Sequence, residues 1–208
     1  MYKNAKSLCL LCAVALAFVL CLPQRILALP QNPSVESGEV SFESPDANTL
    51  SIRASDQAII NFSSFDIASN ETVQIFQPSA QATLLNRVQN ASSATNISGN
   101  FFANGIVFLV NPQGINFGPA ANIQAAGFVA STLDISTRNF LDKKYIFERE
   151  LQNTYAKIVN QGRIAADSIA LIASSVENAP EGLLVAQAGT VALASGDKVT
   201  VSFDSNNL

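Results

Sequence analysis

The chain has 208 residues, of which 48% are hydrophobic and 13% charged, and its formal net charge is −4 at pH 7. This length suits one domain with a substantial core, which excludes a disordered chain. Because the sequence contains no His, it excludes Ser-His-Asp and Cys-His catalysis and His-containing zinc sites. The acidic balance argues against nucleic-acid binding, which requires a surplus of Lys and Arg. We therefore predict no catalytic site, no metal site, no cofactor and no nucleic-acid partner.

Residues 1–28 have the organisation of a secretory signal peptide. Lys3 and Lys6 form a positive start, residues 8–22 carry no charge, and Ala28 offers a small residue for cleavage. We predict cleavage after Ala28 and passage through the general secretion translocase.

A membrane anchor is the alternative interpretation of this segment. Its uncharged run, residues 8–22, is shorter than the roughly 20 residues that a membrane-spanning helix needs, and Pro23 and Arg25 follow it. A lipid anchor on Cys21 is disfavoured because Leu20, rather than a small residue, precedes it. The signal peptide is therefore the preferred interpretation.

The mature chain, residues 29–208, contains no cysteine. All three cysteines lie within residues 1–28, so the exported product can form no disulfide, although secreted domains often use them. Removal of the three basic residues of the signal would leave nine basic residues against 16 acidic ones. The mature net charge of −7 that results predicts an acidic secreted product.

The mature chain reads as a series of short β-strands rather than amphipathic helices. Residues 49–53 and 199–203 alternate between apolar and polar side chains, as half-buried strands do. Residues 106–110 form a continuous apolar run, which predicts a strand buried on both faces. Clusters of Asn, Gly, Pro and Ser separate these runs and predict tight turns.

Similar segments recur at a spacing in the low twenties. Two pairs show the same offset, namely 105–108 with 127–130 and 168–171 with 190–193. A third similarity links residues 110–115 with 159–164 through an Asn/Gly corner. Such a period predicts a β-solenoid, in which about 22 residues per rung give roughly eight rungs. A β-sandwich with coincidental similarity remains the alternative.

Two stretches depart from this pattern. Residues 140–157 concentrate charge and have the most helical composition of the chain, which predicts an excursion packed outside the solenoid. Residues 89–100 are rich in Ser and Asn, and they predict a loop.

Several motifs of the mature chain are similar to those of one known family. They are residues 57–67, residues 84–88 with the sequence Leu-Leu-Asn-Arg-Val, and residues 103–118, which contain Asn111, Pro112, Gln113, Gly114 and Ile115. The similarity continues through residues 127–135 and 189–197. In these segments the chain closely resembles the filamentous haemagglutinin N-terminal domain, also called the two-partner secretion domain.

The resemblance implies both a fold and a role. The fold would be all-β, a right-handed parallel β-helix with extra-helical capping strands and a short helical or loop excursion. Residues 29–208 would form one secretion-targeting domain that is not an enzyme. The periplasmic domains of a cognate outer-membrane transporter would recognise it, and it would fold as a β-helix on export. The protein would then be secreted or lie on the cell surface of a Gram-negative bacterium, reached through the periplasm.

The chain departs from the family pattern at three points. Gln113 replaces the second Asn of the usual Asn-Pro-Asn-Gly-Ile motif, and Phe62 stands where a Trp is common. A second motif, Asn-Pro-Asn-Leu, is absent from the sequence.

Residues 111–114 have the composition of a type I turn, with an acceptor side chain first, a fixed φ second and Gly last. Two interpretations of Asn111, Pro112, Gln113, Gly114 and Ile115 stay open. Either the transporter contacts these side chains directly, or the turn sets the rung that is recognised.

Two other classes of function compete with secretion targeting. A surface adhesin would bind host or neighbouring cells through the exposed solenoid. A polysaccharide-degrading β-helix enzyme would need clustered carboxylates with His or with basic residues and calcium, whereas the eight Asp and eight Glu are scattered. The sequence therefore favours the non-enzymatic interpretations.

Overall fold

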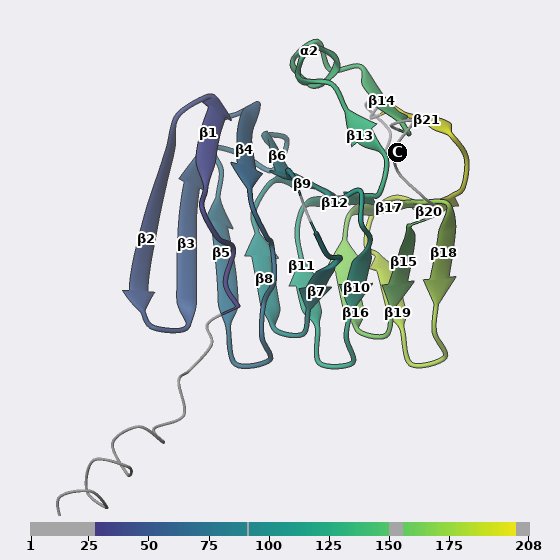
Figure 1. Ribbon diagram of the computed structural model, residues 1–208, viewed down its shortest axis with the longest axis horizontal. Helices are drawn as coiled ribbons and strands as arrows, with labels where there is room; N and C mark the ends of the chain where they lie inside the picture. Colours follow the sequence, from purple (N-terminus) through teal and green to yellow (C-terminus); the bar gives the residue numbers. More distant parts are fainter. Residues whose placement is uncertain (1–27, 91, 150–155, 203–208) are drawn as a thin grey trace, which may run out of the picture.

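The computed structural model describes residues 28–90, 92–149 and 156–202 (Figure 1). Three predominantly parallel sheets run along the molecule, and the chain passes through them in turn, so that successive rungs stack as a parallel β-helix. The predicted signal peptide lies outside the described residues except for Ala28. Among the described residues, no helix is long and apolar enough to cross a membrane.

The first sheet, in spatial order, contains β1 (Ser34–Ser37), β4 (Ala58–Phe62), β6 (Thr83–Val88), β9 (Ile106–Val110), β12 (Gly127–Ser131), β17 (Ser168–Ile172) and β20 (Val191–Ala194). The second contains β2 (Val40–Asp46), β3 (Thr49–Ala54), β5 (Thr72–Phe76), β8 (Asn100–Ala103), β11 (Asn122–Gln124), β16 (Arg163–Ala166) and β19 (Leu183–Ala186). The third is shorter and contains β7 (Thr95–Ile97), β10 (Ile115–Phe117), β15 (Lys157–Asn160) and β18 (Ser175–Asn178).

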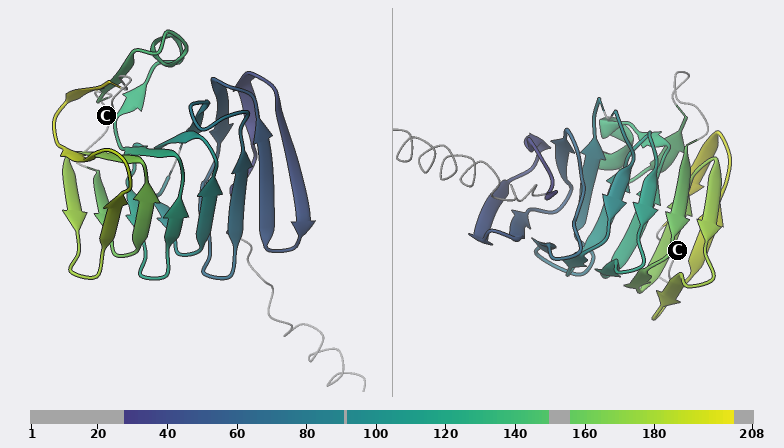
Figure 2. Two further views of the ribbon diagram at one scale, coloured as in Figure 1. Left: turned by 180° about the vertical axis from the view of Figure 1, so that it is seen from behind. Right: turned by 60° about the horizontal axis from the view of Figure 1, so that its bottom comes forward.

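Extra-helical strands lie at one end and along one side of the solenoid, as predicted. At the N-terminal end, β1 pairs antiparallel with β4, and β2 pairs antiparallel with β3. A separate antiparallel sheet contains β13 (Asp134–Ile135), β14 (Tyr145–Glu148) and β21 (Lys198–Val201). Figure 2 shows this sheet and the short helix α2 (Thr137–Leu141) projecting from the stacked rungs.

The described residues form six rungs rather than the predicted eight. Each of the two long sheets has six mutually parallel strands and one antiparallel capping strand. The prediction of eight rungs divides all of residues 29–208 by the repeat period. The capping strands and the extra-helical insertion take up part of that length, so fewer residues are left for rungs. From Phe128 to its partner Ile169, for example, the chain covers about twice the predicted period.

The repeat pattern predicts the strand register in one of three cases. Ile169 pairs with Val191, which confirms the predicted offset there. Val107 pairs with Phe128, so the true offset at that step is shorter and the predicted alignment is wrong by one residue. The reason is that Gly105 lies in the corner before β9, whereas Gly127 begins β12. A slip of one residue exchanges the two faces of a strand.

The third sequence similarity does not reflect stacking. Ile115 pairs with Ile158, and Ile164 pairs with Ile123, so residues 110–115 and 159–164 occupy different corners of their rungs. The prediction of a repeat between these two segments is therefore wrong. An apolar residue flanking an Asn/Gly corner recurs at more than one corner of the solenoid.

Aromatic rings pack along the interior of the helix. Phe62 and Phe65 meet edge to face with ring centres 5.1 Å apart, and Phe101 lies 6.0 Å from Phe65 and 5.9 Å from Phe128. These four rings are nearly or fully buried, and such geometry adds about 0.5–1.5 kcal/mol per pair beyond burial.

The extra-helical elements cover one outer face of the first sheet. Leu109 packs inside the solenoid with the buried apolar side chains around Phe101 and Phe128, which we call the interior cluster. Phe108 faces outward against Phe140, Tyr145 and Phe147. This arrangement confirms that residues 106–110 form a strand buried on both faces, apart from the partly exposed Ile106.

The excursion at residues 140–157 lies outside the solenoid, but it is mainly strand rather than helix where described. Only the end of α2 enters it, and residues 145–148 form β14 because Tyr145 and Phe147 alternate inward onto Phe108. Residues 150–155 lie outside the described residues.

The predicted loop at residues 89–100 contains strand β7. Thr95 and Ile97 are buried while Asn96 is exposed, so a short alternation lies within a polar stretch. The prediction of a loop is wrong for this segment, because Ile97 is the one apolar side chain of β7 and the residues around it are mostly Ser and Asn. The alternating segment at residues 49–53 is confirmed as β3, and residues 199–201 lie in β21, whereas Phe203 lies outside the described residues.

Candidate transporter-recognition turn

The turn that follows β9 is a closed β-turn, as the sequence predicts. The Gly114 N–H donates to the carbonyl oxygen of Asn111 at 3.1 Å, and the Asn111 Oδ1 accepts a hydrogen bond from the Gln113 N–H at 2.9 Å. Gly114 has a φ of +122°, a conformation that side chains with a Cβ rarely adopt. Glycine is therefore required at the last position of the turn.

Asn111 connects the turn to the preceding rung. Its side chain is 1% exposed, and its Nδ2 donates to the Ser93 carbonyl at 3.2 Å and to the Thr95 Oγ1 at 3.0 Å. Its N–H donates to the Ser131 carbonyl at 3.0 Å. Every polar atom of this side chain thus has a partner within the protein, which suits a structural role.

The five predicted site residues differ in their access to solvent. Asn111, Gly114 and Ile115 are buried, Pro112 is half-buried and Gln113 is exposed. A Cβ on Gly114 would lie 3.1 Å from the Lys157 carbonyl oxygen, so the neighbouring rung closes over the turn. In the folded domain, only Pro112 and Gln113 of these five residues present a surface that a partner could contact.

A second polar centre, not identified from sequence, joins the cap to the extra-helical sheet. Arg87 on β6 is 6% exposed, and it contacts Glu36 of β1 and Asp134 of β13, each at 3.0 Å. It also donates to the Ile135 carbonyl at 2.6 Å. Arg87 lies within a family motif, but its acidic partners are 51 and 47 residues away, so no local spacing indicates the pairing.

Glu36 is held in its charged form by these neighbours. Partial burial raises its pKa, but hydrogen bonds from Thr137 and Asn61 and the charge of Arg87 outweigh that effect, and the net pKa is lowered. Within the part of the chain that the structure describes, no group of three or more His, Cys, Asp or Glu side chains could hold a metal ion.

Comparison with known proteins identifies this architecture. The family model of the TPS secretion domain matches residues 28–207. The crystal structure of the HMW1 secretion domain from Haemophilus influenzae is similar with a TM-score of 0.77 and 36% identity, over 83% of this chain and 46% of that one.

Two curated relatives are heme/hemopexin-binding proteins of Haemophilus influenzae. One is 34% identical over 60% of this chain, and the other, from strain Rd, is 32% identical over 86% of this chain. The matched regions span 13% and 20% of the length of these relatives. The chain belongs to the family of TPS secretion domains, the targeting domains of two-partner secretion exoproteins.

Proposed function

We propose that this domain takes its protein from the periplasm to a cognate outer-membrane transporter and has no catalytic activity of its own. Residues 1–28 would direct the chain through the general secretion translocase and be cleaved after Ala28. The mature domain, at least partly unfolded, would dock on the periplasmic domains of the transporter, where an extended segment can add to a sheet edge. The family match over residues 28–207 carries this proposal.

The topology supports export coupled to folding. Between the two ends of the solenoid, each described parallel strand pairs with the strands of the rungs before and after it, so a rung needs only its neighbour in order to form. A chain that emerges through a transporter can therefore fold from the N-terminal cap onward. Each new rung on the outer side would oppose backward movement without ATP.

We propose that the turn at residues 111–115 acts mainly by building its rung. The buried contacts of Asn111 and the positive φ of Gly114 support this, because both features form the turn and fix it against the neighbouring rung. A direct contact in the folded state would be limited to Pro112 and Gln113.

Two variants test this interpretation of the turn. Asn111→Ala should destabilise the domain by about 1–3 kcal/mol, since it removes hydrogen bonds and leaves buried partners unsatisfied, and it should reduce release into the medium. Gln113→Ala removes an exposed side chain and should leave both the urea midpoint and the release unchanged. Loss of release by Gln113→Ala with an unchanged midpoint would instead establish direct recognition of Gln113.

A further inference from the structure

Glu71 is a buried residue whose carboxylate contacts Ala28, the first described residue of the chain. The residue is 1% exposed, although it directly precedes β5 in a polar turn. One carboxylate oxygen accepts a hydrogen bond from the Ala28 N–H at 2.8 Å, and the other accepts one from the Ala68 N–H at 2.8 Å. Among the ion pairs formed by the described residues, none includes Glu71.

A buried carboxylate that accepts hydrogen bonds only from neutral donors would be stabilised further by a cationic partner. Removing a charge from water is expensive, and two neutral N–H donors compensate less than a charge-assisted partner does. The proposed processing creates such a partner at this place. Hydrolysis of the peptide bond between Ala28 and Leu29 would leave a carboxylate on Ala28, which departs with the signal peptide, and an α-ammonium group on Leu29. In the uncleaved chain the Ala28 N–H binds Glu71, so the new ammonium group would lie one residue from that contact.

The segment that follows the cleavage site is fixed in position. Leu29 is 9% exposed within the interior cluster, and Pro30 is buried. The Gln31 N–H donates to the Ser64 carbonyl, and the Ser63 N–H donates to the Gln31 carbonyl, both at 3.0 Å. A terminus at Leu29 would therefore be held where Glu71 can reach it.

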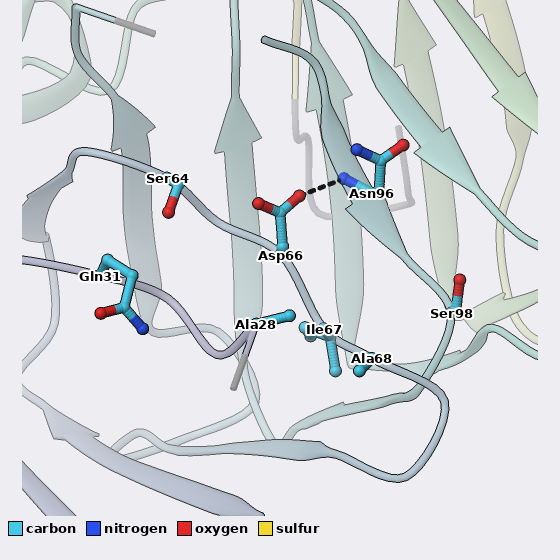
Figure 3. A pocket seen from close by; sticks show the side chains of 8 residues that line it. All are labelled: Ala28, Gln31, Ser64, Asp66, Ile67, Ala68, Asn96 and Ser98. Atoms are coloured by element: carbon cyan, nitrogen blue, oxygen red, sulfur yellow. Dashed lines mark hydrogen bonds between the residues drawn. The ribbon is translucent and has the colours of Figure 1, made fainter. Parts of the chain in front are cut away.

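The surroundings can accept the new charged group. An open groove of about 360 Å³ borders Ala28, and among the described residues that line it, Asp66 is acidic and none is basic. Figure 3 shows Ala28, Ile67 and Asp66 among the residues that line this groove, with Asp66 bonded to the Asn96 N–H. The groove leaves space for an ammonium group and its water, and its charge favours a cation.

From these observations we propose that Glu71 is the receptor for the amino terminus of the processed chain. The ion pair between Glu71 and the Leu29 ammonium group would hold residues 29–31 against the first rungs once the signal peptide is removed. Cap closure would thus depend on processing. This inference rests on the proposed export route, because that route supplies the cleavage.

A double-mutant cycle tests the ion pair. The protein is purified after processing in its host, and mass spectrometry identifies its first residue. A second version carries Gly-Ser-Gly inserted between Ala28 and Leu29, so that processing still occurs but the amino group lies farther along the chain from Leu29. Glu71→Gln is introduced into both versions, and Glu43→Gln, on the exposed face of β2, is the charge-matched control.

We expect Glu71→Gln to reduce the folding equilibrium constant about tenfold more in the natural version than in the extended one, which corresponds to about 1.4 kcal/mol. Glu43→Gln should have the same small effect in both. Equal losses from Glu71→Gln in the two versions would overturn the proposal, as would a natural terminus more than two residues from Leu29. The cycle is independent of the transporter, so failure of export and failure of this ion pair are distinguishable.

Discussion

At the scale of single residues, Asn86 is the exception within the interior of the solenoid. It occupies a column with Ile60, Leu109, Ala130 and Leu171 in neighbouring rungs. The residue is fully buried, and within the described part of the chain neither its Nδ2 nor its Oδ1 has a hydrogen-bond partner. An unsatisfied buried amide opposes folding, so this rung is less stable than its aliphatic neighbours imply.

We predict that Asn86→Leu stabilises the domain. Leu109 already occupies the equivalent position in the next rung, and the replacement removes two unsatisfied polar atoms. The free energy of unfolding, measured with urea, should rise by about 1–3 kcal/mol. Asn116→Leu is the control, since the Asn116 side chain donates to Asn96 outside the core, and it should give no gain. A lower urea midpoint for Asn86→Leu would show that the amide has a role in the fold.

The turn residues show what sequence can predict at this scale. Asn, Pro and Gly at positions 111, 112 and 114 predict the β-turn because each residue type has a local backbone preference. The burial of Asn111 depends on Ser93 and Thr95 of the preceding rung, and no local pattern encodes that contact. The contact of Glu71 with Ala28 is likewise not encoded locally, because Ala28 lies 43 residues earlier.

At the scale of elements, Arg87 connects three parts of the fold that are distant in sequence. Strand β1, strand β6 and strand β13 meet at its guanidinium group through Glu36 and Asp134. The cap and the extra-helical sheet are therefore attached to the same rung. The ion pair with Glu36 therefore holds the capping strand β1 against the stacked rungs.

We predict that Arg87→Met destabilises the domain by about 3 kcal/mol, because it leaves two partly buried carboxylates without their cation. Urea unfolding measures the change. Arg138→Met is the control, because the Arg138 side chain is 90% exposed and its 3.9 Å pair with Asp142 contributes little. Equal midpoints for Arg87→Met and the natural protein would contradict the role of Arg87.

The same centre predicts a dependence of stability on pH. The pKa of Glu36 is lower in the folded chain than its ordinary value of 4.5, so its contribution to stability is complete above that value. The contribution is lost as the pH falls through the lower, folded pKa. Arg87→Met removes part of the cause and should therefore weaken the loss of stability in acid, which urea midpoints measured across the acid range would reveal.

Strand prediction succeeds where burial gives a clear pattern. The apolar run at residues 106–110 and the alternation at residues 49–53 both predict strands that the structure contains. Strand β7 escapes prediction because it contributes only Ile97 as an apolar side chain. The predicted register between β9 and β12 is wrong because similar glycines lie at different points of their rungs.

At the scale of the whole molecule, the stacked rungs and the absence of cysteine from residues 29–208 fit one account of export. A chain that threads through a transporter must reach it without crosslinks, and rungs that stack in order can form as they emerge. A repeat period in the low twenties and a known family resemblance are enough to predict the solenoid. The number of rungs is not predictable, because the extra-helical insertion interrupts the period between β12 and β17.

We predict that a disulfide between adjacent rungs blocks export. Asn96 and Asn116 are paired on neighbouring parallel strands, and their side chains bond at 3.1 Å, so cysteines there can approach each other. The oxidised Asn96→Cys/Asn116→Cys variant should accumulate in the periplasm, and a reductant should restore release. The single Asn116→Cys variant is the control. Equal release of the oxidised double variant would count against threading.

The secretion-targeting role is tested by the location of a tagged chain of residues 1–208 in its native host. Cytoplasm, periplasm, outer membrane and medium are fractionated with the transporter present and with its gene deleted. We predict tagged protein at the cell surface or in the medium only when the transporter is present, and loss of that protein when residues 111–114 are scrambled. Tagged protein confined to the periplasm in both strains would contradict a secretion-targeting role.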